Sequence, residues 1–290
     1  KKLKWKKTSM GFFYKNKLFK WGSISSVLCF PELSFLSKIR YIFHTLSCLI
    51  KTDWTKLDRL SATRWLRKWI GVKAFNILWS KLFFYKFYQY DNDISAAWIW
   101  SRIKRLGLSR KFFRENLGFL EGGSKELINS LESIILKNGG QIKTSFPILS
   151  IVPNKDTGAK LITKRGEENF DIVISTIPLP LVPKLLKVKK NKEFLITSYK
   201  KITSIACACV LIRTNKKVTN NFWTNINDKR FNIPGIIEMS NLRKLPFNLV
   251  YIPFYMPFEN PDYRRNDQDF VRDAWECLKS LNPKLKDKDL

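Results

Sequence analysis

The chain has 290 residues, of which 44% are hydrophobic and 14% aromatic, so it is long enough and apolar enough to bury a substantial core. Its longest apolar run, Ile202 to Ile212, is interrupted by Thr203 and Ser204 and falls short of the ~20 residues that cross a bilayer, and no secretory signal is visible. The formal net charge of +29 would suit a nucleic acid or an anionic membrane, but the lysines are spread along the whole chain without a zinc signature, RNP motif or recognition helix, so no nucleic-acid partner is expected.

Residues 1 to about 30 are predicted to form short aromatic strands at the edge of a lobe. The first of these contains Trp5, and two aromatic runs, Phe12-Phe13-Tyr14 and Leu18-Phe19, then flank the turn signal Lys15-Asn16-Lys17. Pro31 closes this hairpin, because proline cannot donate to a strand ladder.

The segment from Leu33 to Ile50 has the pattern of an amphipathic helix, with Lys38 and Arg40 opposite its apolar side. Two interpretations stay open. The helix packs on the rest of its lobe, which we favour, or it binds an anionic membrane surface peripherally. The single histidine, His44, lies within this helix without a nucleophile elbow beside it, so a Ser-His-Asp hydrolase is not expected.

Three further helices are predicted from their apolar periodicity and their end signals. They span Ala62 to Ile70, after Ser61 and before Gly71, then Val72 to Lys86, and Ala96 to Leu106 after Ser95.

The most informative stretch runs from Gly118 to Pro183. Gly122 and Gly123 precede a helix that Ser124 is predicted to cap, and Asn138 to Gly140 supply the left-handed residues that end it. Its apolar residues recur at three- and four-residue steps; they are Leu127, Ile128, Leu131, Ile134, Ile135 and Leu136.

Short strands follow this helix. Ile148 to Val152 and Leu161 to Thr163 lie on either side of the turn signal Asn154 to Gly158 and predict an antiparallel crossover. The run Ile172-Val173-Ile174 is apolar on both faces, as in a strand buried in a parallel sheet, and Ser175-Thr176-Ile177-Pro178 ends it. Cofactors lie at the carboxyl ends of such strands, so the order predicts the middle of a nucleotide-binding domain.

After Pro183, strands are predicted near Thr203 to Arg213, Gly235 to Met239 and Leu249 to Tyr255, and a helix from Asp267 to Leu281. Five cysteines without disulfide-like spacing indicate a reducing compartment, so a cytoplasmic location is expected. Cys207 and Cys209 share one face of the first strand. We expect both to pack in the core and expect no metal site, because they lack partners for zinc.

Four motifs, taken in this order, resemble the flavin-dependent amine oxidase superfamily, which includes protoporphyrinogen oxidase, phytoene desaturase and monoamine oxidase. They are Gly122-Gly123 to Leu127, Gly139-Gly140-Gln141-Ile142, Pro147-Ile148, and Val173-Ile174-Ser175-Thr176-Ile177-Pro178. Further runs resemble the substrate domain of bacterial NAD(P)/FAD-dependent oxidoreductases in this superfamily, among them Ser95 to Lys104, Phe222 to Ile226, Ile236 to Asn241 and Val250 to Pro253.

The resemblance implies a fold class of α/β plus α+β. A partial FAD/NAD(P)-binding domain, Rossmann-like and of the glutathione-reductase type, would be formed by residues 116–187. A substrate domain of helices and an antiparallel sheet would be formed by residues 1–115 and 188–290. The superfamily's G-x-G-x-x-G does not occur, so we interpret the chain as the interior of a longer enzyme. The 290 residues alone are expected to retain little or no FAD and to be inactive.

The resemblance implies FAD as the cofactor and six positions close to it. Gly122 and Gly123 would allow close approach, the Ile148 backbone would meet the adenine, and Thr176, Ile177 and Pro178 would lie against the cofactor. Core packing remains the alternative for Ile148 and Ile177.

No catalytic side chain is identified, because a flavin carries its own redox chemistry. Lys86 could hold a water at a flavin ring, although a solvated lysine at a helix end is favoured. Trp98 and Trp100 either line a substrate tunnel or fill a helical core. Glu238 and Asn241 either bind a polar substrate or cap a strand end.

The leading hypothesis is an FAD-dependent oxidoreductase that removes a hydride from an unidentified small organic substrate. A mutase-like enzyme that uses reduced flavin for a net non-redox step is an alternative. The rival from another class is a basic, non-catalytic protein that binds an anionic membrane or nucleic acid.

Overall fold

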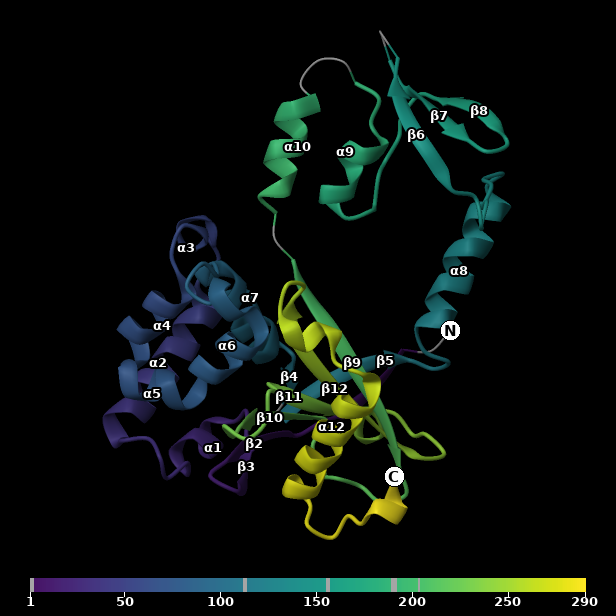
Figure 1. Ribbon diagram of the computed structural model, residues 1–290. Coiled ribbons are helices and arrows are strands. Elements are labelled where there is room, and N and C mark those ends of the chain that lie inside the picture. The colour runs from purple at the N-terminus through teal and green to yellow at the C-terminus, as the bar shows by residue number, and fades with distance from the viewer. Residues whose placement is uncertain (1–2, 112–113, 155–156, 189–191, 203) are drawn as a thin grey trace. The chain divides into compact units, whose positions relative to one another are not determined.

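The computed structural model describes residues 3–111, 114–154, 157–188, 192–202 and 204–290. They form two compact units, which Figure 1 draws as ribbons. The first unit joins Lys1–Glu121 to Ile205–Leu290, and the second unit is Gly122–Ser204.

A six-stranded mixed sheet forms the centre of the first unit, with the strand order β3-β2-β10-β11-β12-β9. The strands are β2 (Met10–Tyr14), β3 (Lys17–Trp21), β9 (Ile205–Thr214), β10 (Trp223–Asn227), β11 (Gly235–Glu238) and β12 (Asn248–Pro257). Only β2 and β10 run parallel, and the other neighbours are antiparallel. A smaller sheet contains β1 (Leu3–Lys7), β5 (Arg114–Leu120) and β4 (Arg110–Lys111).

The predicted N-terminal hairpin is confirmed as β2 and β3. Lys15 and Asn16 connect the two strands with φ angles of 48° and 61°. A two-residue turn with both residues in the left-handed region matches the twist of antiparallel strands. Trp5 lies outside the hairpin, because β1 pairs with β5.

Helices cover one face of this sheet. They are α1 (Ile24–Leu28), α2 (Phe35–Ile50), α3 (Thr55–Asp58), α4 (Ala62–Ile70), α5 (Val72–Leu78), α6 (Ser80–Phe87), η1 (Tyr88–Tyr90) and α7 (Ala96–Leu108). The predicted caps Ser61 and Ser95 accept hydrogen bonds from the amides of Arg64 and Ala97. The prediction of one helix from Val72 to Lys86 was wrong, because Trp79 (φ −127°, ψ −33°) separates α5 from α6.

Two hydrophobic cores hold the first unit together. One lies between the sheet and α12 (Asp267–Leu281), and it includes Ile212, Ile252 and Leu278. The other lies between the opposite face of the sheet and α4 to α7, and it includes Phe12, Leu66 and Phe83. Core residues therefore pack against both faces of the sheet.

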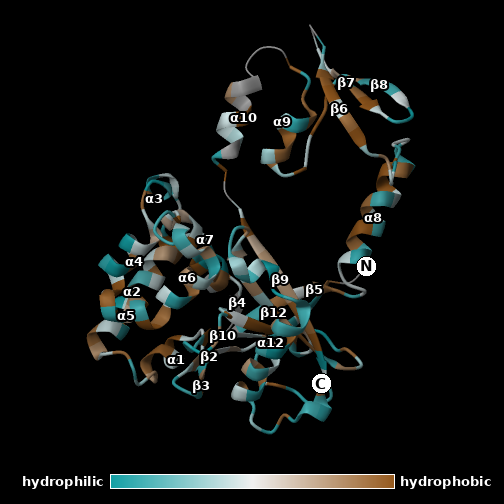
Figure 2. Cartoon of the chain, in the orientation of Figure 1, coloured by the Kyte–Doolittle hydropathy of each residue, from teal (hydrophilic) through white to brown (hydrophobic). Residues whose placement is uncertain are grey.

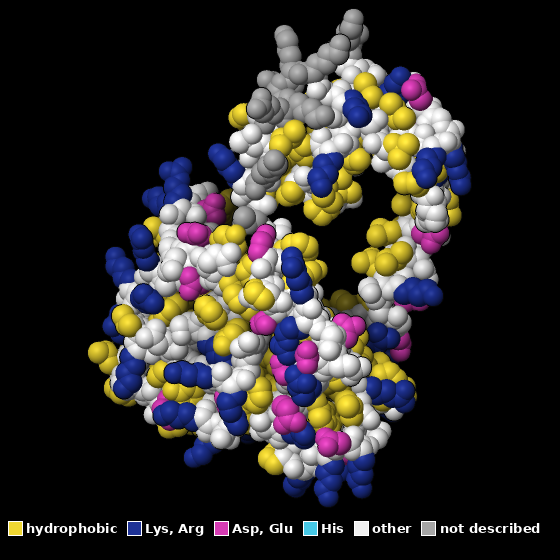
Figure 3. Space-filling model, viewed as in Figure 1, with side chains coloured by type: hydrophobic (Ala, Val, Ile, Leu, Met, Phe, Trp, Pro, Cys, Tyr) yellow, Lys and Arg dark blue, Asp and Glu magenta, His cyan; other side chains and the backbone are white. Residues whose placement is uncertain are grey.

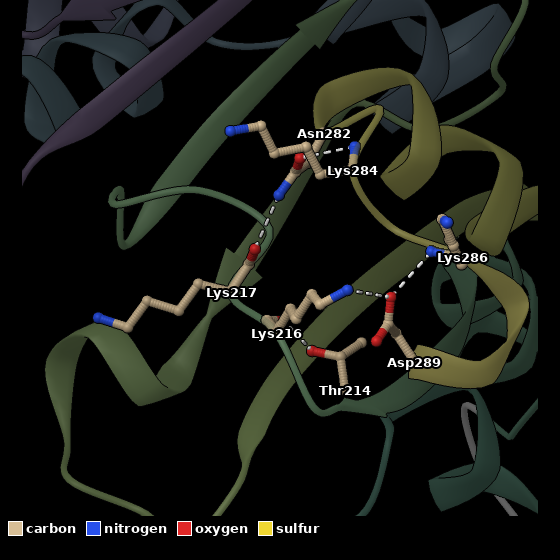
Figure 4. Close-up of polar contacts among 7 residues, drawn as sticks. All are labelled: Thr214, Lys216, Lys217, Asn282, Lys284, Lys286 and Asp289. Atoms are coloured by element: carbon tan, nitrogen blue, oxygen red, sulfur yellow. Dashed lines mark hydrogen bonds and ion pairs between the residues drawn. The ribbon is translucent and has the colours of Figure 1, made fainter.

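Short elements complete the C-terminal part of the first unit. They are α11 (Met239–Leu242), η3 (Pro261–Arg264) and η4 (Asp287–Asp289). Figure 4 shows how the end of the chain is tied to the segment after β9. The carboxylate of Asp289 accepts from the Lys216 ammonium at 3.1 Å and from the Lys286 amide at 2.9 Å, while Asn282 donates to the Lys217 carbonyl. Because Asp289 is buried, these bonds satisfy its charge.

The second unit contains a helix, an antiparallel sheet and shorter helices. Its elements are α8 (Ser124–Lys137), β6 (Ile148–Pro153), β7 (Ala159–Thr163), β8 (Gly166–Phe170), η2 (Leu179–Leu181), α9 (Val182–Leu185) and α10 (Lys192–Lys200). The sheet order is β6-β7-β8 with both pairs antiparallel, which confirms the predicted crossover. Lys155 and Asp156 of the predicted turn lie outside the described residues, as does Thr203 at the start of a predicted strand.

Two predictions for the second unit were wrong. Gly123, not Ser124, is the N-cap of α8, and no side chain caps this end. The run Ile172-Val173-Ile174 is no strand, and Ile172 and Ile174 are 79% and 85% exposed. Among the described residues no neighbouring strand pairs with this run, and a parallel strand exists only where neighbours supply its hydrogen bonds.

The apolar face of α8 is solvent-exposed in the part of the chain that the structure describes. Figure 2 shows hydrophobic residues along the whole helix, and none of its residues is buried. The exposed fractions of Ile128 and Ile134 are 62% and 56%. The predicted amphipathic helix is therefore confirmed. Its apolar face is not covered by any of the described residues.

The limits of the two units differ from those of the predicted segments 1–115, 116–187 and 188–290. Pairing of β5 with β1 groups residues up to Glu121 with the first unit. At the other end, α10 contacts α9 and so belongs with the second unit. No helix in the described ranges is both long and apolar enough to span a bilayer.

Candidate functional site

A cavity of about 840 Å³ lies in the first unit, between one face of the six-stranded sheet and the helices α1, α2, α6 and α7. The sheet lines it with Met10, Phe12, Trp21, Trp223, Asn225, Ile237 and Tyr255. The helices line it with Val27, Tyr41, Ile42, Leu82, Lys86, Trp98, Ile99 and Arg102, among others. A largely apolar cavity of this size with a few polar groups is typical of small-molecule sites.

Strand alternation explains which sheet residues reach the cavity. In β10, Trp223 and Asn225 line it, whereas the intervening Thr224 and the next residue, Ile226, are buried on the other side. In β12, Tyr255 lines it, whereas its neighbour Phe254 packs in the core against α12. The same sheet therefore supplies a core on one face and a cavity wall on the other.

Lys86 lies on the cavity wall near the end of α6. Its ammonium is 5.5 Å from the centre of the Trp98 indole and 5.1 Å from the centre of the Tyr255 ring. Burial lowers the pKa of Lys86 to about 8, and the nearby charge of Arg102 acts in the same direction. Lys86 does lie at the end of a helix, as the favoured interpretation expected, but its side chain is half-buried and not fully solvated.

Arg102 lies on α7, one helical turn after Trp98. Its guanidinium carbon is 4.8 Å from the centre of the same indole. Burial lowers the pKa of Arg102, and Arg105 adds to this effect. Sequence reasoning missed Arg102, although the i, i+4 spacing from Trp98 predicts that both side chains lie on one helix face.

The structure separates the two tryptophans of α7. Trp98 lines the cavity, as the tunnel interpretation expected. Trp100 is buried in a small core with Cys48, Leu57 and Ala96, as the packing interpretation expected.

Cys207 and Cys209 are exposed, so the prediction that they pack in the core was wrong. They do share one face of β9, while Ala208 and Val210 pack toward the core against α12. β9 is an edge strand of the sheet, so only one of its sides has a neighbouring strand. Partial burial of the two thiol groups raises the pKa of both.

Glu238 and Asn241 are structural residues. The Glu238 carboxylate is buried and accepts from the amide of Thr219 at 2.9 and 3.0 Å and from its hydroxyl. The Asn241 amide donates to the carbonyls of Thr219 and Asn221. Both side chains therefore hydrogen-bond the end of β11 and the start of α11 to the segment before β10.

The six predicted cofactor positions all lie in the second unit. Gly122 and Gly123 form the turn before α8 with φ angles of 89° and 84°. Ile148 begins β6, and Thr176, Ile177 and Pro178 lie in the exposed segment that leads into η2 and α9. Ile148 and the segment of Thr176 to Pro178 thus lie in or next to β6 and α9, which contact each other, whereas the glycines lie directly before α8.

The turn before α8 requires glycine at both positions. A Cβ on Gly122 would lie 2.4 Å from Cγ of Glu126, and the left-handed φ of both glycines disfavours side chains. The N-terminal amides of α8 have no side-chain cap, which is the arrangement that binds anionic groups at helix ends. Among the described residues, no group of three or more His, Cys, Asp and Glu side chains could hold a metal ion.

Comparison with known proteins identifies the family. The model for flavin-containing amine oxidoreductases matches residues 16–276. No curated protein sequence matches the chain.

Three solved structures illustrate the similarity of fold. An oxidoreductase from Methanosarcina mazei has a TM-score of 0.71 and 16% identity over 98% of this chain and 68% of its own. Reduced UDP-galactopyranose mutase has a TM-score of 0.69 and 12% identity over 100% of this chain and 65% of its own. Putrescine oxidase bound to putrescine has a TM-score of 0.62 and 13% identity over 97% of this chain and 66% of its own.

The chain thus spans about two thirds of the length of these relatives. The family match covers most of both units, and it includes the cofactor motifs and all the cavity residues except Met10 and Phe12. The chain therefore belongs to the flavin-containing amine oxidoreductase family, whose members are FAD-dependent enzymes.

Proposed function

We propose that this chain is part of an FAD-dependent oxidoreductase that removes a hydride from a small organic substrate. The observation that carries the proposal is the family match over residues 16–276. Most of the residues that line the mainly apolar cavity of about 840 Å³ lie within that match. The first unit is the substrate domain in this proposal. The second unit is part of a Rossmann-like FAD-binding domain.

Within the second unit, the proposed FAD contacts are the six positions that the motifs indicate. Gly122 and Gly123 carry no side chains, and the uncapped amides of α8 favour a negative group. The backbone of Ile148 and the exposed segment of Thr176, Ile177 and Pro178 supply polar and apolar contacts. The flavin, when bound, accepts the hydride, and the protein orients the substrate and excludes water.

The absorption spectrum of the protein purified from its complete gene tests the proposal. We expect a yellow protein whose flavin absorption bleaches on anaerobic reduction. A product that stays colourless after loading with excess FAD would contradict the proposal and favour a non-catalytic, basic binding protein.

The similarity to UDP-galactopyranose mutase supports a second candidate, a flavin enzyme with a net non-redox reaction. The two candidates differ in the flavin state that supports turnover. An oxidoreductase is reduced by its substrate during turnover, whereas a mutase-like enzyme turns over only after its flavin has been reduced beforehand.

A diamine substrate, which the putrescine oxidase structure contains, is disfavoured for this chain. Lys86 and Arg102 place two positive charges on the cavity wall, and like charges repel a cationic amine.

We also propose peripheral association with anionic membranes in a reducing compartment such as the cytoplasm. The helix α2 exposes Phe35, Phe43 and Ile50 with exposed fractions of 74%, 62% and 81%. Beside it, a groove of about 770 Å³ is lined by Arg40, Arg59, Leu60, Ser61, Arg64, Trp65, Lys68, Trp69 and Phe43. Basic and aromatic side chains together match an anionic bilayer surface, and all five cysteines are free.

A further inference from the structure

We propose that the cavity of the first unit binds a substrate whose apolar body carries an oxyanion, a carboxylate or a phosphate, and that Lys86 and Arg102 hold this group. The inference rests on the proposed function in one respect, because it takes the ligand of this cavity to be the substrate.

The two cations converge from different helices on one aromatic residue. The Lys86 ammonium and the Arg102 guanidinium lie 5.5 and 4.8 Å from the centre of the Trp98 indole. All three side chains line the cavity. An oxyanion that binds there lies near two positive groups, and the cation–π contacts with Trp98 restrict the positions of both.

Both cations lack a counter-charge in the part of the chain that the structure describes. Their interactions there are with aromatic rings, and neither forms an ion pair or a hydrogen bond with a described residue. Glu115, the one acidic residue among the described residues of the cavity wall, has an interaction partner of its own. Charged groups that are partly removed from water are stabilised by a bound opposite charge, so the pair favours an anionic ligand.

The remaining wall determines the body of the ligand. Phe12, Trp21, Ile99, Trp223 and Ile237 present aromatic and aliphatic surface to the cavity. Burial of an apolar ligand body against this surface makes the free energy of binding more favourable. The same surface would favour binding of an apolar amine, but repulsion between its positive charge and those of Lys86 and Arg102 would weaken that binding.

Three naphthalene probes of similar shape and different charge test the inference by calorimetric titration of the protein purified from its complete gene and incubated with excess FAD. They are 2-naphthoate, the neutral 2-naphthamide and the cationic 2-naphthylmethylammonium. We expect 2-naphthoate to bind about tenfold more tightly than 2-naphthamide, and the cation to bind most weakly. Equal affinities for the three probes, or tightest binding of the cation, would overturn the proposal.

Variants assign the preference to the two cations. Lys86→Met and Arg102→Met are each expected to lower 2-naphthoate affinity about tenfold and to leave 2-naphthamide affinity within about twofold. The unchanged amide affinity shows that the cavity is intact. Lys86→Arg should retain the preference because it keeps the charge. Lys73→Met, which removes an exposed lysine of α5, is the matched control and should change neither affinity. Retention of full 2-naphthoate affinity in both methionine variants would refute the assignment.

The outcome is separable from the proposed function. Flavin absorption and its reduction are read on the same samples. A protein that is yellow and reducible but does not prefer 2-naphthoate contradicts only the anion site. A colourless protein that still prefers 2-naphthoate contradicts the flavin function and leaves the anion site supported.

Discussion

At the residue scale, burial shifts the pKa of two side chains whose positions in the sequence do not indicate it. Lys86 and Glu238 both lie near the ends of regular elements, where exposure is common. In the structure Lys86 is half-buried and Glu238 is buried, and the pKa of each moves toward neutrality, to about 8 and about 7. Each shift has a measurable consequence.

The affinity of the cavity for 2-naphthoate is expected to fall as the pH rises through about 8, because Lys86 then loses its proton in the free protein. The groups that face it are not expected to contribute, since Arg102 stays charged and burial raises the pKa of Cys207 and Tyr255 above their usual values. Calorimetric titration between pH 6.5 and 9.5 measures the effect, which is about tenfold. Lys86→Arg should remove the pH dependence, and a wild-type affinity that is independent of pH would contradict the assignment.

Glu238 is expected to make the protein less stable as the pH rises. Burial raises its pKa from 4.5 to about 7 in spite of the hydrogen bonds from Thr219. The folded state therefore holds a proton that the unfolded state releases, so the stabilisation is complete below about pH 4.5 and is lost as the pH approaches 7.

Urea unfolding at pH 5 and pH 8 measures this contribution. We expect the free energy of unfolding to fall by about 2 kcal/mol from this group, and Glu238→Gln to remove that loss. The matched control is Glu259→Gln, which alters an exposed carboxylate of the same unit. Identical pH dependence in wild type and Glu238→Gln would show that Glu238 is not the group responsible.

At the element scale, caps and glycines decide where helices end. Ser61, Ser95 and Asn266 accept amide hydrogen bonds at the starts of α4, α7 and α12, and the first two were predicted from residue type. Gly71 ends α4 and begins α5 with φ 85° and ψ 157°. The break at Trp79 was not predictable, because no glycine or proline marks it and the apolar pattern continues through it.

Gly71→Ala is expected to destabilise the protein by about 1–3 kcal/mol through backbone strain alone. The nearest atom to an added Cβ is Nη1 of Arg40 at 3.6 Å, which is an ordinary contact, so steric overlap contributes little. Thermal and urea unfolding measure the cost. Lys68→Ala on the exposed side of α4 is the control and should stay within about 0.5 kcal/mol of wild type. A loss of the same small size for Gly71→Ala would indicate another backbone conformation at this junction.

At the scale of the whole molecule, the charge is distributed over the surface. Figure 3 shows Lys and Arg side chains scattered over the visible face of both units, with no single continuous basic stripe. This distribution matches the even spread of lysine along the sequence and does not favour a nucleic-acid groove. The patch around α2 differs because it combines basic with exposed aromatic and aliphatic side chains.

Vesicle co-sedimentation tests this patch. We expect binding to vesicles that contain phosphatidylglycerol and none to pure phosphatidylcholine, because the attraction depends on anionic lipid. Substitution of both Phe43 and Ile50 by Ser should reduce the bound fraction severalfold, whereas Leu108→Ser, at an exposed position of α7, should not. Equal binding to both vesicle types would contradict the membrane proposal.

The sequence by itself determined the local elements and the family. Spacing and end signals predicted α4, α7 and α12 nearly residue by residue, because caps and helical periodicity act over a few neighbouring residues. The order of the motifs between Gly122 and Pro178 identified the flavin-dependent superfamily to which the chain belongs.

Only the tertiary structure decided which side chains meet. Lys86, Arg102 and Tyr255 come from α6, α7 and β12, and they converge because those elements pack around one cavity. The exposure of Cys207 and Cys209 depends on the edge position of β9, and the exposure of Ile172 and Ile174 on the absence of a pairing strand among the described residues. Burial and strand pairing are set by residues far away in the sequence, which a local pattern does not contain.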